Sequence, residues 1–282
     1  MIVTKTALKT PLRYPGGKSR ATKKMAQYFP LFYPDYTEFR EPFLGGGSVA
    51  LYISQMHPHL DVWVNDLYEP LYNFWVQLQK NGDEITNQLV QLKQRHPDPS
   101  SAKVLFLESK EYLTHGVRQT SDTARAVAFY IVNKCSFSGL TESSSFSKQA
   151  SDSNFSMRGI NKLPYYSQLI KKWKITNLSY EKLLTDDQTA FLYLDPPYDI
   201  KSNLYGRKGD MHKGFDHDQF FFDCDAAKCD QMISYNSNNI IKNRFINWKA
   251  YEYDHTYTMR SVGEYMIDQN KRKELLLLNY TI

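Results

Sequence analysis

Long hydrophobic runs, cysteine-rich stretches and metal-binding clusters are missing from this 282-residue sequence. No apolar run approaches the roughly 20 residues that a membrane-spanning helix needs, so we expect no contact with a membrane. The three cysteines, Cys135, Cys224 and Cys229, are too few and too unevenly spaced for a disulfide framework or a closed zinc site. We therefore expect reduced, structural cysteines and no metal.

The N-terminus and the glycines lack three further signatures. Residues 1–5 do not have the charged and then apolar segments of a signal peptide, which predicts a cytoplasmic protein. The glycines at 45–47 do not follow the G-x-G-x-x-G spacing of dinucleotide sites, and no Lys-Ser or Lys-Thr pair follows them as in a Walker loop. A nicotinamide oxidoreductase is therefore disfavoured.

The composition is that of a globular protein with a substantial core. Hydrophobic residues make up 41% of the chain, and its mean hydropathy is −0.56. A net charge of +5 is compatible with a polyanionic partner but common among other proteins. Aromatic residues reach 15%, including 21 tyrosines, and would suit stacking on splayed bases, although core packing can account for most of them.

Residues 190–198, Ala-Phe-Leu-Tyr-Leu-Asp-Pro-Pro-Tyr, are the most informative segment. Their apolar run predicts a short strand buried on both faces, which ends where proline removes a backbone donor. The Asp195 carboxylate and the Pro196 carbonyl could each accept one N–H of an exocyclic amine, while Tyr198 stacks on the base. A simple strand-terminating turn is the alternative interpretation of the tetrapeptide.

Two glycine turns precede that segment. Residues 14–18, Tyr-Pro-Gly-Gly-Lys, predict a tight turn that places Lys18 at the start of a helix. A positive charge is unfavourable at that end of the helix dipole, which indicates that Lys18 serves an anion rather than the helix. Residues 36–48 predict a strand, a glycine loop and a helix, as in a nucleotide-binding βα turn. A second strand, 60–64, delivers Asp66, which is placed either to bind ribose hydroxyls or to cap the next helix.

Between residues 72 and 166 the pattern becomes helical, with helices predicted over 73–80, 84–95, 102–114 and 123–134. We predict an insertion at 72–166 into a core formed by 1–71 and 167–282. Hydroxyl-rich residues 136–149 and the following basic residues supply donors that read base edges and phosphates, although a disordered surface loop is the alternative.

The core is predicted to resume with strands at 174–180, 190–194, 232–237, 251–257 and 274–280, and with a helix that begins near residue 215. The polar stretch 199–214 is a candidate substrate loop. The basic connection 260–273 suits phosphates.

Four motifs in this order resemble the Dam-type (D12 class, alpha group) DNA adenine-N6 methyltransferases: residues 14–18, 41–47, 65–66 and 195–198. Segments 133–140 and 260–276 follow the same layout, so the resemblance spans nearly the whole chain. It implies an α/β fold with a Rossmann-like, seven-stranded, mostly parallel sheet flanked by helices, and a mainly helical target-recognition insertion. It also implies S-adenosyl-L-methionine as methyl donor and direct transfer to N6 of an adenine flipped out of double-stranded DNA, without a metal.

The same resemblance distributes the candidate site residues among three roles. The catalytic residues would be Asp195, Pro196 and Tyr198. The cofactor-binding residues would be Tyr14, Gly17, Lys18, Glu41, Pro42, Phe43, Gly45, Gly47, Asp66 and Asp195. The DNA-binding residues would be Lys134, Ser138, Leu140, Thr141, Glu142, Ser144, Arg158, Lys213, Arg260 and Arg272.

Two positions depart from the family pattern. Many members carry an acid before the aromatic residue that here is Tyr180, whereas this chain has Ser179. Members that read GATC carry an arginine two positions after the Gly-Leu pair, where this chain has Glu142. Because a glutamate cannot donate to guanine but can accept from a cytosine amine, GATC is not expected to be the preferred site.

Rival functions remain open at this point. Methyltransferases that act on RNA or on a protein glutamine more often begin the catalytic tetrapeptide with Asn, and cytosine-N4 enzymes with Ser. A non-catalytic DNA-binding module on the same fold is a further alternative. If the chain is a DNA methyltransferase, it would work beside a separate restriction endonuclease or as a solitary or phage enzyme.

Overall fold

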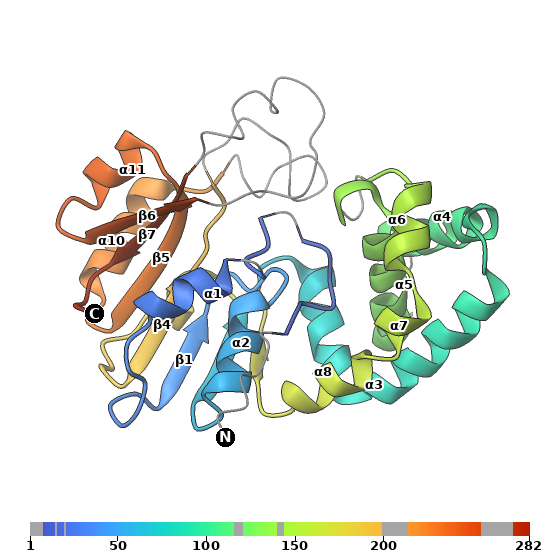
Figure 1. The fold of residues 1–282 in the computed structure, drawn as a ribbon, viewed down its shortest axis with the longest axis horizontal. Helices are drawn as coiled ribbons and strands as arrows, with labels where there is room; N and C mark the ends of the chain where they lie inside the picture. Colours follow the sequence, from blue (N-terminus) through green and yellow to red (C-terminus); the bar gives the residue numbers. More distant parts are fainter. Residues whose placement is uncertain are drawn as a thin grey trace.

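The computed structural model describes residues 8–14, 16–19, 21–115, 121–139, 144–198, 214–254 and 273–282. In this part of the chain seven strands form a single sheet in the order β3-β2-β1-β4-β5-β7-β6 (Figure 1). The strands are β1 (Glu38–Glu41), β2 (Asp61–Asn65), β3 (Lys174–Thr176), β4 (Ala190–Leu194), β5 (Asp230–Asn236), β6 (Lys249–Asp254) and β7 (Lys273–Leu278).

The strand order gives the sheet a switch point between β1 and β4. Strands β3, β2, β1, β4 and β5 are parallel, whereas β7 is antiparallel to both of its neighbours. From β1 the chain moves outward through β2 to β3, and it then returns to β4 on the other side of β1. The predicted Rossmann-like fold is confirmed, and ligands of such sheets bind at the carboxyl ends of the strands beside the switch point.

Hydrophobic cores cover both faces of strand β4. Phe191 and Tyr193 point into the larger hydrophobic core, and Leu192 and Leu194 into the second one. Helices α1 (Thr22–Met25) and α2 (Ser48–Met56) contribute to the first core; α10 (His217–Ala226) and α11 (Asn239–Arg244) contribute to the second. A strand that is apolar at every position is what two covered faces require.

A helical segment lies between β2 and β3 in sequence and to one side of the sheet (Figure 1). It consists of α3 (Glu69–Arg95), α4 (Pro99–His115), α5 (Asp122–Cys135), the 3₁₀ helix η2 (Phe137–Gly139), α6 (Lys148–Asn154), α7 (Met157–Ile160) and α8 (Leu163–Leu169). The helices predicted over 73–80 and 84–95 are the two arms of α3, which meet at a kink at Asn81, whose backbone angles are not helical.

Two elements differ from the predictions. The helix predicted from Lys18 begins at Thr22, and after Met25 it tightens into the 3₁₀ helix η1 (Ala26–Tyr28). The strand predicted over 174–180 ends at Thr176, and the next turn is the 3₁₀ helix η3 (Tyr180–Leu183). Within the described residues, helices long and apolar enough to cross a membrane are absent.

Phe191 offers a test of the packing that holds β4 in place. Its side chain is fully buried, and its ring lies within 6.3 Å, centroid to centroid, of the rings of Phe29, Phe32, Tyr36, Phe39 and Tyr280. Phe191→Ala should lower the free energy of unfolding by about 3–5 kcal/mol because it leaves a cavity. Phe222→Ala, at an exposed ring on α10, should change it by less than about 0.5 kcal/mol in the same urea titration. Equal losses in the two variants would contradict this account of the core.

Candidate active site

The glycine loop that follows β1 is shaped by close contacts with two aromatic rings. Gly45 and Gly47 have φ values of +50° and +68°, which favour glycine. A Cβ atom on Gly45 would lie 2.9 Å from the ring of Tyr14, and one on Gly47 would lie 2.8 Å from the ring of Trp75. Side chains are therefore excluded at both positions, and the turn presents bare backbone at the end of β1.

Asp66, just beyond β2, holds this loop against the start of α3. One carboxylate oxygen accepts the backbone N–H of Gly45 at 2.8 Å, and the other accepts that of Tyr68 at 2.9 Å. Burial raises the pKa of Asp66 to about 6, against the lowering effect of these two hydrogen bonds. Each oxygen keeps a further lone pair for a ligand hydroxyl.

Glu41 closes the other side of the loop. It is the last residue of β1 and is 3% exposed, and its carboxylate accepts the backbone N–H of Ala50 at 2.8 Å. Burial raises the pKa of Glu41 well above its usual range. This contact ties β1 to α2, and the neighbouring Pro42 accepts a hydrogen bond from the Asn65 amide at 3.1 Å.

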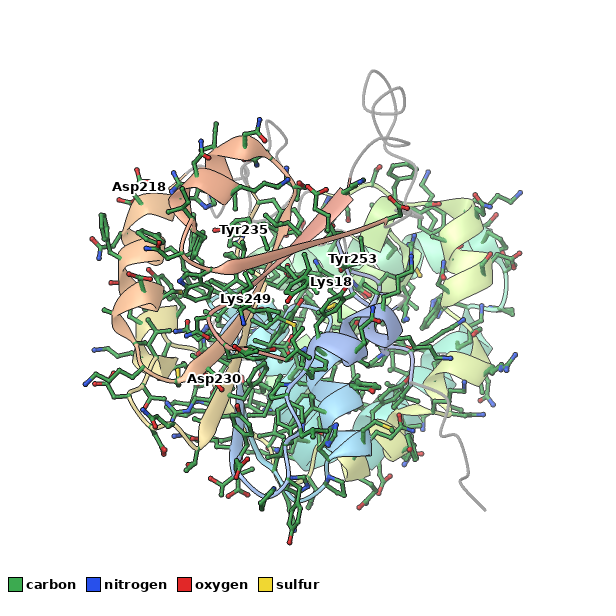
Figure 2. The ribbon with its side chains drawn as sticks, turned by 60° about the vertical axis from the view of Figure 1, so that its left-hand side comes forward. Lys18, Asp218, Asp230, Tyr235, Lys249 and Tyr253 are labelled. Carbon is green, nitrogen blue, oxygen red and sulfur yellow. The ribbon has the colours of Figure 1, made fainter. Side chains whose placement is uncertain are left out.

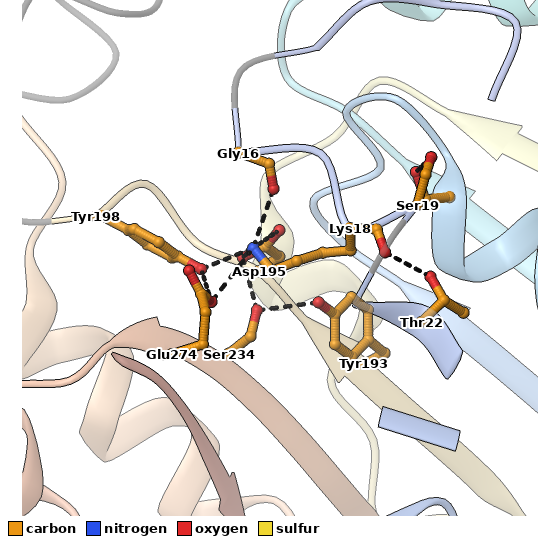
Figure 3. A network of polar contacts seen from close by, with 10 residues as sticks. Gly16, Lys18, Ser19, Thr22, Tyr193, Asp195, Tyr198, Ser234 and Glu274 are labelled. Atoms are coloured by element: carbon orange, nitrogen blue, oxygen red, sulfur yellow. Dashed lines mark hydrogen bonds and ion pairs between the residues drawn. The ribbon is translucent and has the colours of Figure 1, made fainter. Parts of the chain in front are cut away.

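Lys18 is a buried cation at the centre of the site. Its ammonium lies 2.9 Å from both carboxylate oxygens of Asp195 and 2.7 Å from the Tyr198 hydroxyl, and it also donates to the carbonyl of Gly16 (Figure 3). Burial alone would lower the pKa of Lys18, but Asp195, Tyr198 and Glu274 outweigh it and raise the pKa well above its usual value. In Figure 2 Lys18 lies among packed side chains, whereas Asp218 lies at the periphery.

Asp195 is the residue at which three parts of the chain meet. It directly follows β4, and besides Lys18 it accepts a hydrogen bond from the Ser234 hydroxyl of β5 at 2.6 Å. Ser234 in turn lies 2.9 Å from the hydroxyl of Tyr193. The carboxylate is 22% exposed, so it is oriented from behind by protein groups and remains open toward a ligand.

Tyr198 is held by its hydroxyl, which accepts from Lys18 and donates to a carboxylate oxygen of Glu274 at 2.9 Å (Figure 3). Glu274 lies at the start of β7 and was not among the residues predicted from the sequence. Ser234 was also missed, although both belong to segments predicted as strands. Their proximity to Asp195 follows from strand order, which the local sequence does not contain.

Phe43 belongs to an aromatic wall beside the glycine loop. Its ring stacks on that of Tyr180, with centroids 5.5 Å apart and 28° between the planes, and it contacts Phe215 and Phe220 edge-on. The hydroxyl of Tyr180 donates to Asp223 at 2.6 Å. Phe43, Tyr180 and Phe215 are only partly buried, so part of this apolar wall is accessible beyond the carboxyl end of β1.

The N-terminal turn is also attached to the end of α5. The side chain of Asn133 accepts the backbone N–H of Arg13 at 2.9 Å and donates to the carbonyls of Arg13 and Gly139 at 2.6 and 2.9 Å. The guanidinium of Arg13 donates to the carbonyl of Ser136 at 2.5 Å. Tyr14 and Gly17, which follow Arg13, are joined by a backbone hydrogen bond of 3.1 Å. Asn133 therefore holds both the N-terminal turn, whose residues 14–18 are predicted to bind the cofactor, and the start of the hydroxyl-rich segment 136–149.

The residues predicted to contact DNA are only partly described. Lys134 is 9% exposed, and its ammonium lies 5.3 Å from the centre of the Tyr130 ring; burial and Arg13 lower the pKa of Lys134 to about 8. Ser144 is buried, and its carbonyl accepts from Lys110, whereas Arg158 is exposed on α7. The backbone of Ser138 lies in η2. Outside the described residues are Leu140, Thr141, Glu142, Lys213, Arg260 and Arg272. DNA contacts by all ten residues stay predictions.

A metal site would need several His, Cys, Asp or Glu side chains close together in the described ranges. Groups of three or more His, Cys, Asp or Glu side chains that could hold an ion are absent there. The free thiols of Cys135, Cys224 and Cys229 are all buried.

Comparison with known proteins agrees with the geometry. A family model for the D12 class N6 adenine-specific DNA methyltransferases matches residues 14–259. The type II methyltransferase M1.LlaDCHI of Lactococcus lactis subsp. cremoris is 23% identical over 283 residues, which cover 95% of this chain and 94% of that protein. The type II methyltransferase M.MjaIII of Methanocaldococcus jannaschii is 22% identical over 201 residues, which cover 66% of this chain and 68% of that protein. Because the family model matches most of its length, the chain belongs to the D12 class of N6 adenine-specific DNA methyltransferases.

Proposed function

We propose that this protein transfers a methyl group from S-adenosyl-L-methionine to N6 of an adenine flipped out of duplex DNA, at one short recognition sequence. The observation that carries the proposal is the Asp195 carboxylate, which lies at the switch point of the sheet, is held by Lys18 and Ser234, and is followed by Tyr198. Membership of an adenine-specific DNA methyltransferase family supports the choice of substrate.

The loop around Gly45 suits S-adenosylmethionine, which supplies an activated methyl group when bound. The bare backbone at Gly45 and Gly47 allows close approach of a ligand, and the Asp66 carboxylate has lone pairs for ribose hydroxyls. Phe43 and Tyr180 offer an apolar surface for a purine ring. Tyr14, Gly17, Glu41 and Pro42 form and support this loop and the turn before Lys18.

Asp195 and Pro196 would orient the reacting amine. The carboxylate and the backbone carbonyl can each accept one N6 proton, which turns the nitrogen lone pair toward the methyl donor, while Tyr198 stacks on the base. Flipping the base costs a few kcal/mol of unstacking. Preorganised electrostatics and positioning carry the rate enhancement, so no covalent enzyme intermediate is required.

The helical insertion at 72–166 would read the DNA sequence, and the core at 1–71 and 167–282 would bind the cofactor and the flipped base. Glu142, in place of the arginine of the family members that read GATC, disfavours GATC. Because both relatives are named type II methyltransferases, we propose a role in a restriction-modification system with a separate endonuclease. A solitary or phage enzyme is the alternative context.

The whole proposal can be tested with plasmid DNA from a host that expresses this chain and has no methyltransferase of its own. The native plasmid is sequenced by a method that detects modified bases. N6-methyladenine should appear at one short motif that differs from GATC. Unmodified plasmid, with the purified protein folded and binding S-adenosylmethionine, would shift the assignment to an RNA or protein-amide substrate. Absence of cofactor binding as well would favour a non-catalytic DNA-binding module.

Replacement of Asp195 tests its catalytic role. Asp195→Ala should lower the single-turnover rate of methyl transfer by at least about 10²-fold, because a preorganised acceptor for the reacting amine is lost. Cofactor affinity, measured by calorimetry, should change by less than about tenfold. Asp187→Ala, an exposed carboxylate before the opposite end of β4, is the matched control and should retain the wild-type rate. A rate for Asp195→Ala equal to that of this control would remove Asp195 from the mechanism.

The raised pKa of Asp66 predicts a pH dependence for cofactor binding. The ionised carboxylate accepts hydroxyl protons best, so affinity should be highest above pH 7 and should fall as the pH drops through about 6, where Asp66 becomes protonated. Asp66→Ala should bind S-adenosylmethionine weakly and lose this pH dependence. Asp61→Ala, at the exposed start of β2, should retain both the affinity and the pH dependence. Unchanged binding by Asp66→Ala, or an effect confined to DNA affinity, would contradict the assignment.

A further inference from the structure

Glu274 is a second buried carboxylate beside Lys18 that the proposed mechanism does not yet use. It lies at the start of β7, opposite Asn236 of β5 and Tyr253 of β6, and is 1% exposed. One oxygen accepts from the Tyr198 hydroxyl at 2.9 Å and lies 3.8 Å from the Lys18 ammonium. Its other oxygen is buried and has no hydrogen-bond partner among the described residues.

Such a carboxylate is a poor stabiliser of the fold. A buried carboxylate oxygen without a partner retains its desolvation cost, and most buried polar atoms in native proteins avoid this situation. A side chain kept in such surroundings next to a reactive centre is therefore a candidate for a functional role. Glu274 is 79 positions from Asp195 in sequence, so it is the fold that brings Glu274 to the site.

The charges of Lys18, Asp195 and Glu274, here called the cluster, allow it to take up one proton. Lys18 carries one positive charge, whereas Asp195 and Glu274 in their ionised forms carry two negative charges, so the buried cluster is then negative by one. Among the described residues, the titratable groups that face Glu274 are Lys18, Asp195, Tyr198 and Tyr253. Burial and the nearby Asp195 raise the pKa of Glu274 against the lowering effect of Lys18.

We propose that Glu274 is the final acceptor of the proton that adenine N6 loses during methyl transfer. This inference rests on the proposed function. The contacts that carry it run without a break from the Asp195 carboxylate through the Lys18 ammonium and the Tyr198 hydroxyl to Glu274, with donor–acceptor distances of 2.9, 2.7 and 2.9 Å (Figure 3).

The proposed step balances in atoms and charge. The N6 lone pair forms the new nitrogen–carbon bond, the sulfur–carbon bond of the donor breaks, and its electron pair stays on sulfur. Nitrogen then carries one proton and one positive charge in excess, and the Asp195 carboxylate takes that proton. Lys18 receives it from Asp195 as it gives another to the Tyr198 oxygen, and Tyr198 gives its own proton to Glu274. The cluster ends neutral, and Lys18 and Tyr198 end in the states in which they began.

A purely structural role for Glu274, in which it only holds the Tyr198 ring, makes a different prediction. Glu274→Gln retains a side-chain carbonyl that accepts from Tyr198 but cannot take up the proton. A structural role therefore predicts normal transfer by this variant. The proposed role predicts a defect in transfer with normal base flipping.

The decisive experiment is single-turnover methyl transfer over a range of pH values with duplex DNA that contains the methylated motif. In the wild type the rate should fall as the pH drops through the pKa of Glu274, above the usual range for glutamate, because only the ionised form accepts a proton. Glu274→Gln should be slower by about 10²-fold and should lose this dependence. Tyr198→Phe, which keeps the ring and removes the relay hydroxyl, should show the same loss.

Two further readouts separate a proton-transfer defect from a structural one. The fluorescence of 2-aminopurine at the target position should show equal base flipping in the wild type and in Glu274→Gln. An infrared difference spectrum of one turnover should show a new protonated carboxyl band in the wild type that Glu274→Gln lacks. Glu252→Gln, at a surface carboxylate of β6 paired with Lys242 and Lys273, is the matched control and should behave as the wild type.

The possible outcomes are distinct. Transfer by Glu274→Gln within twofold of the wild type at every pH overturns the inference, and so does a wild-type rate for Tyr198→Phe. If Glu274→Gln does not fold, two other results test the inference. A slower transfer rate for Tyr198→Phe and a protonated carboxyl band in the wild type would support it, and the absence of either would contradict it. A wild type that binds this DNA and the cofactor but forms no N6-methyladenine would instead refute the proposed function.

Discussion

The buried ion pair between Lys18 and Asp195 is the interaction on which the organisation of the site depends. It joins residues 177 positions apart and fixes the N-terminal turn against the end of β4. A lysine that is 3% exposed is tolerated because Asp195, Tyr198 and Glu274 together offset its desolvation. Loss of Lys18 leaves Asp195 and Glu274 without a counter-charge, and breaking a buried ion pair in this way costs about 3–5 kcal/mol in proteins. The pair therefore links the stability of this region to the orientation of the proposed catalytic carboxylate.

The same N-terminal turn connects that carboxylate to the segments proposed to bind cofactor and DNA. Arg13 is held by Asn133 at the end of α5, and the next residue, Tyr14, packs against the backbone of Gly45 in the glycine loop. A displacement of the 136–139 segment would therefore act on the turn that delivers Lys18. Hydrogen bonds and packed contacts thus join the segment proposed to bind DNA to the turn that carries Lys18.

Local patterns predicted most of the individual helices and strands, the family resemblance implied how the sheet is built, and long-range strand pairing explains the contacts that were missed. The all-apolar run of β4, the glycine loop and the position of Asp66 are encoded within a few residues each, so periodicity and turn chemistry suffice to find them. Ser234 and Glu274 reach Asp195 only because β5 neighbours β4 and because β7 inserts antiparallel between β5 and β6. The sequence indicated that Lys18 serves an anion, but it did not show that Asp195 lies within 2.9 Å. Lys134, which the resemblance implies as a DNA-binding residue, lies with its ammonium 5.3 Å from the centre of the Tyr130 ring on the same helix, a contact that does not test its role with DNA.

The cost of the cluster argues that it serves chemistry rather than folding. Replacing buried ion pairs by apolar residues of similar volume often leaves stability unchanged or improves it, so two carboxylates around one lysine are an unfavourable way to pack the end of a sheet. Burial holds the pKa values of Glu274 and Tyr198 above their usual ranges. One oxygen of Glu274 is left without a hydrogen bond among the described residues. In the proposed methyl transfer, this preorganised cluster would orient the amine and take up its proton with groups that are already in contact.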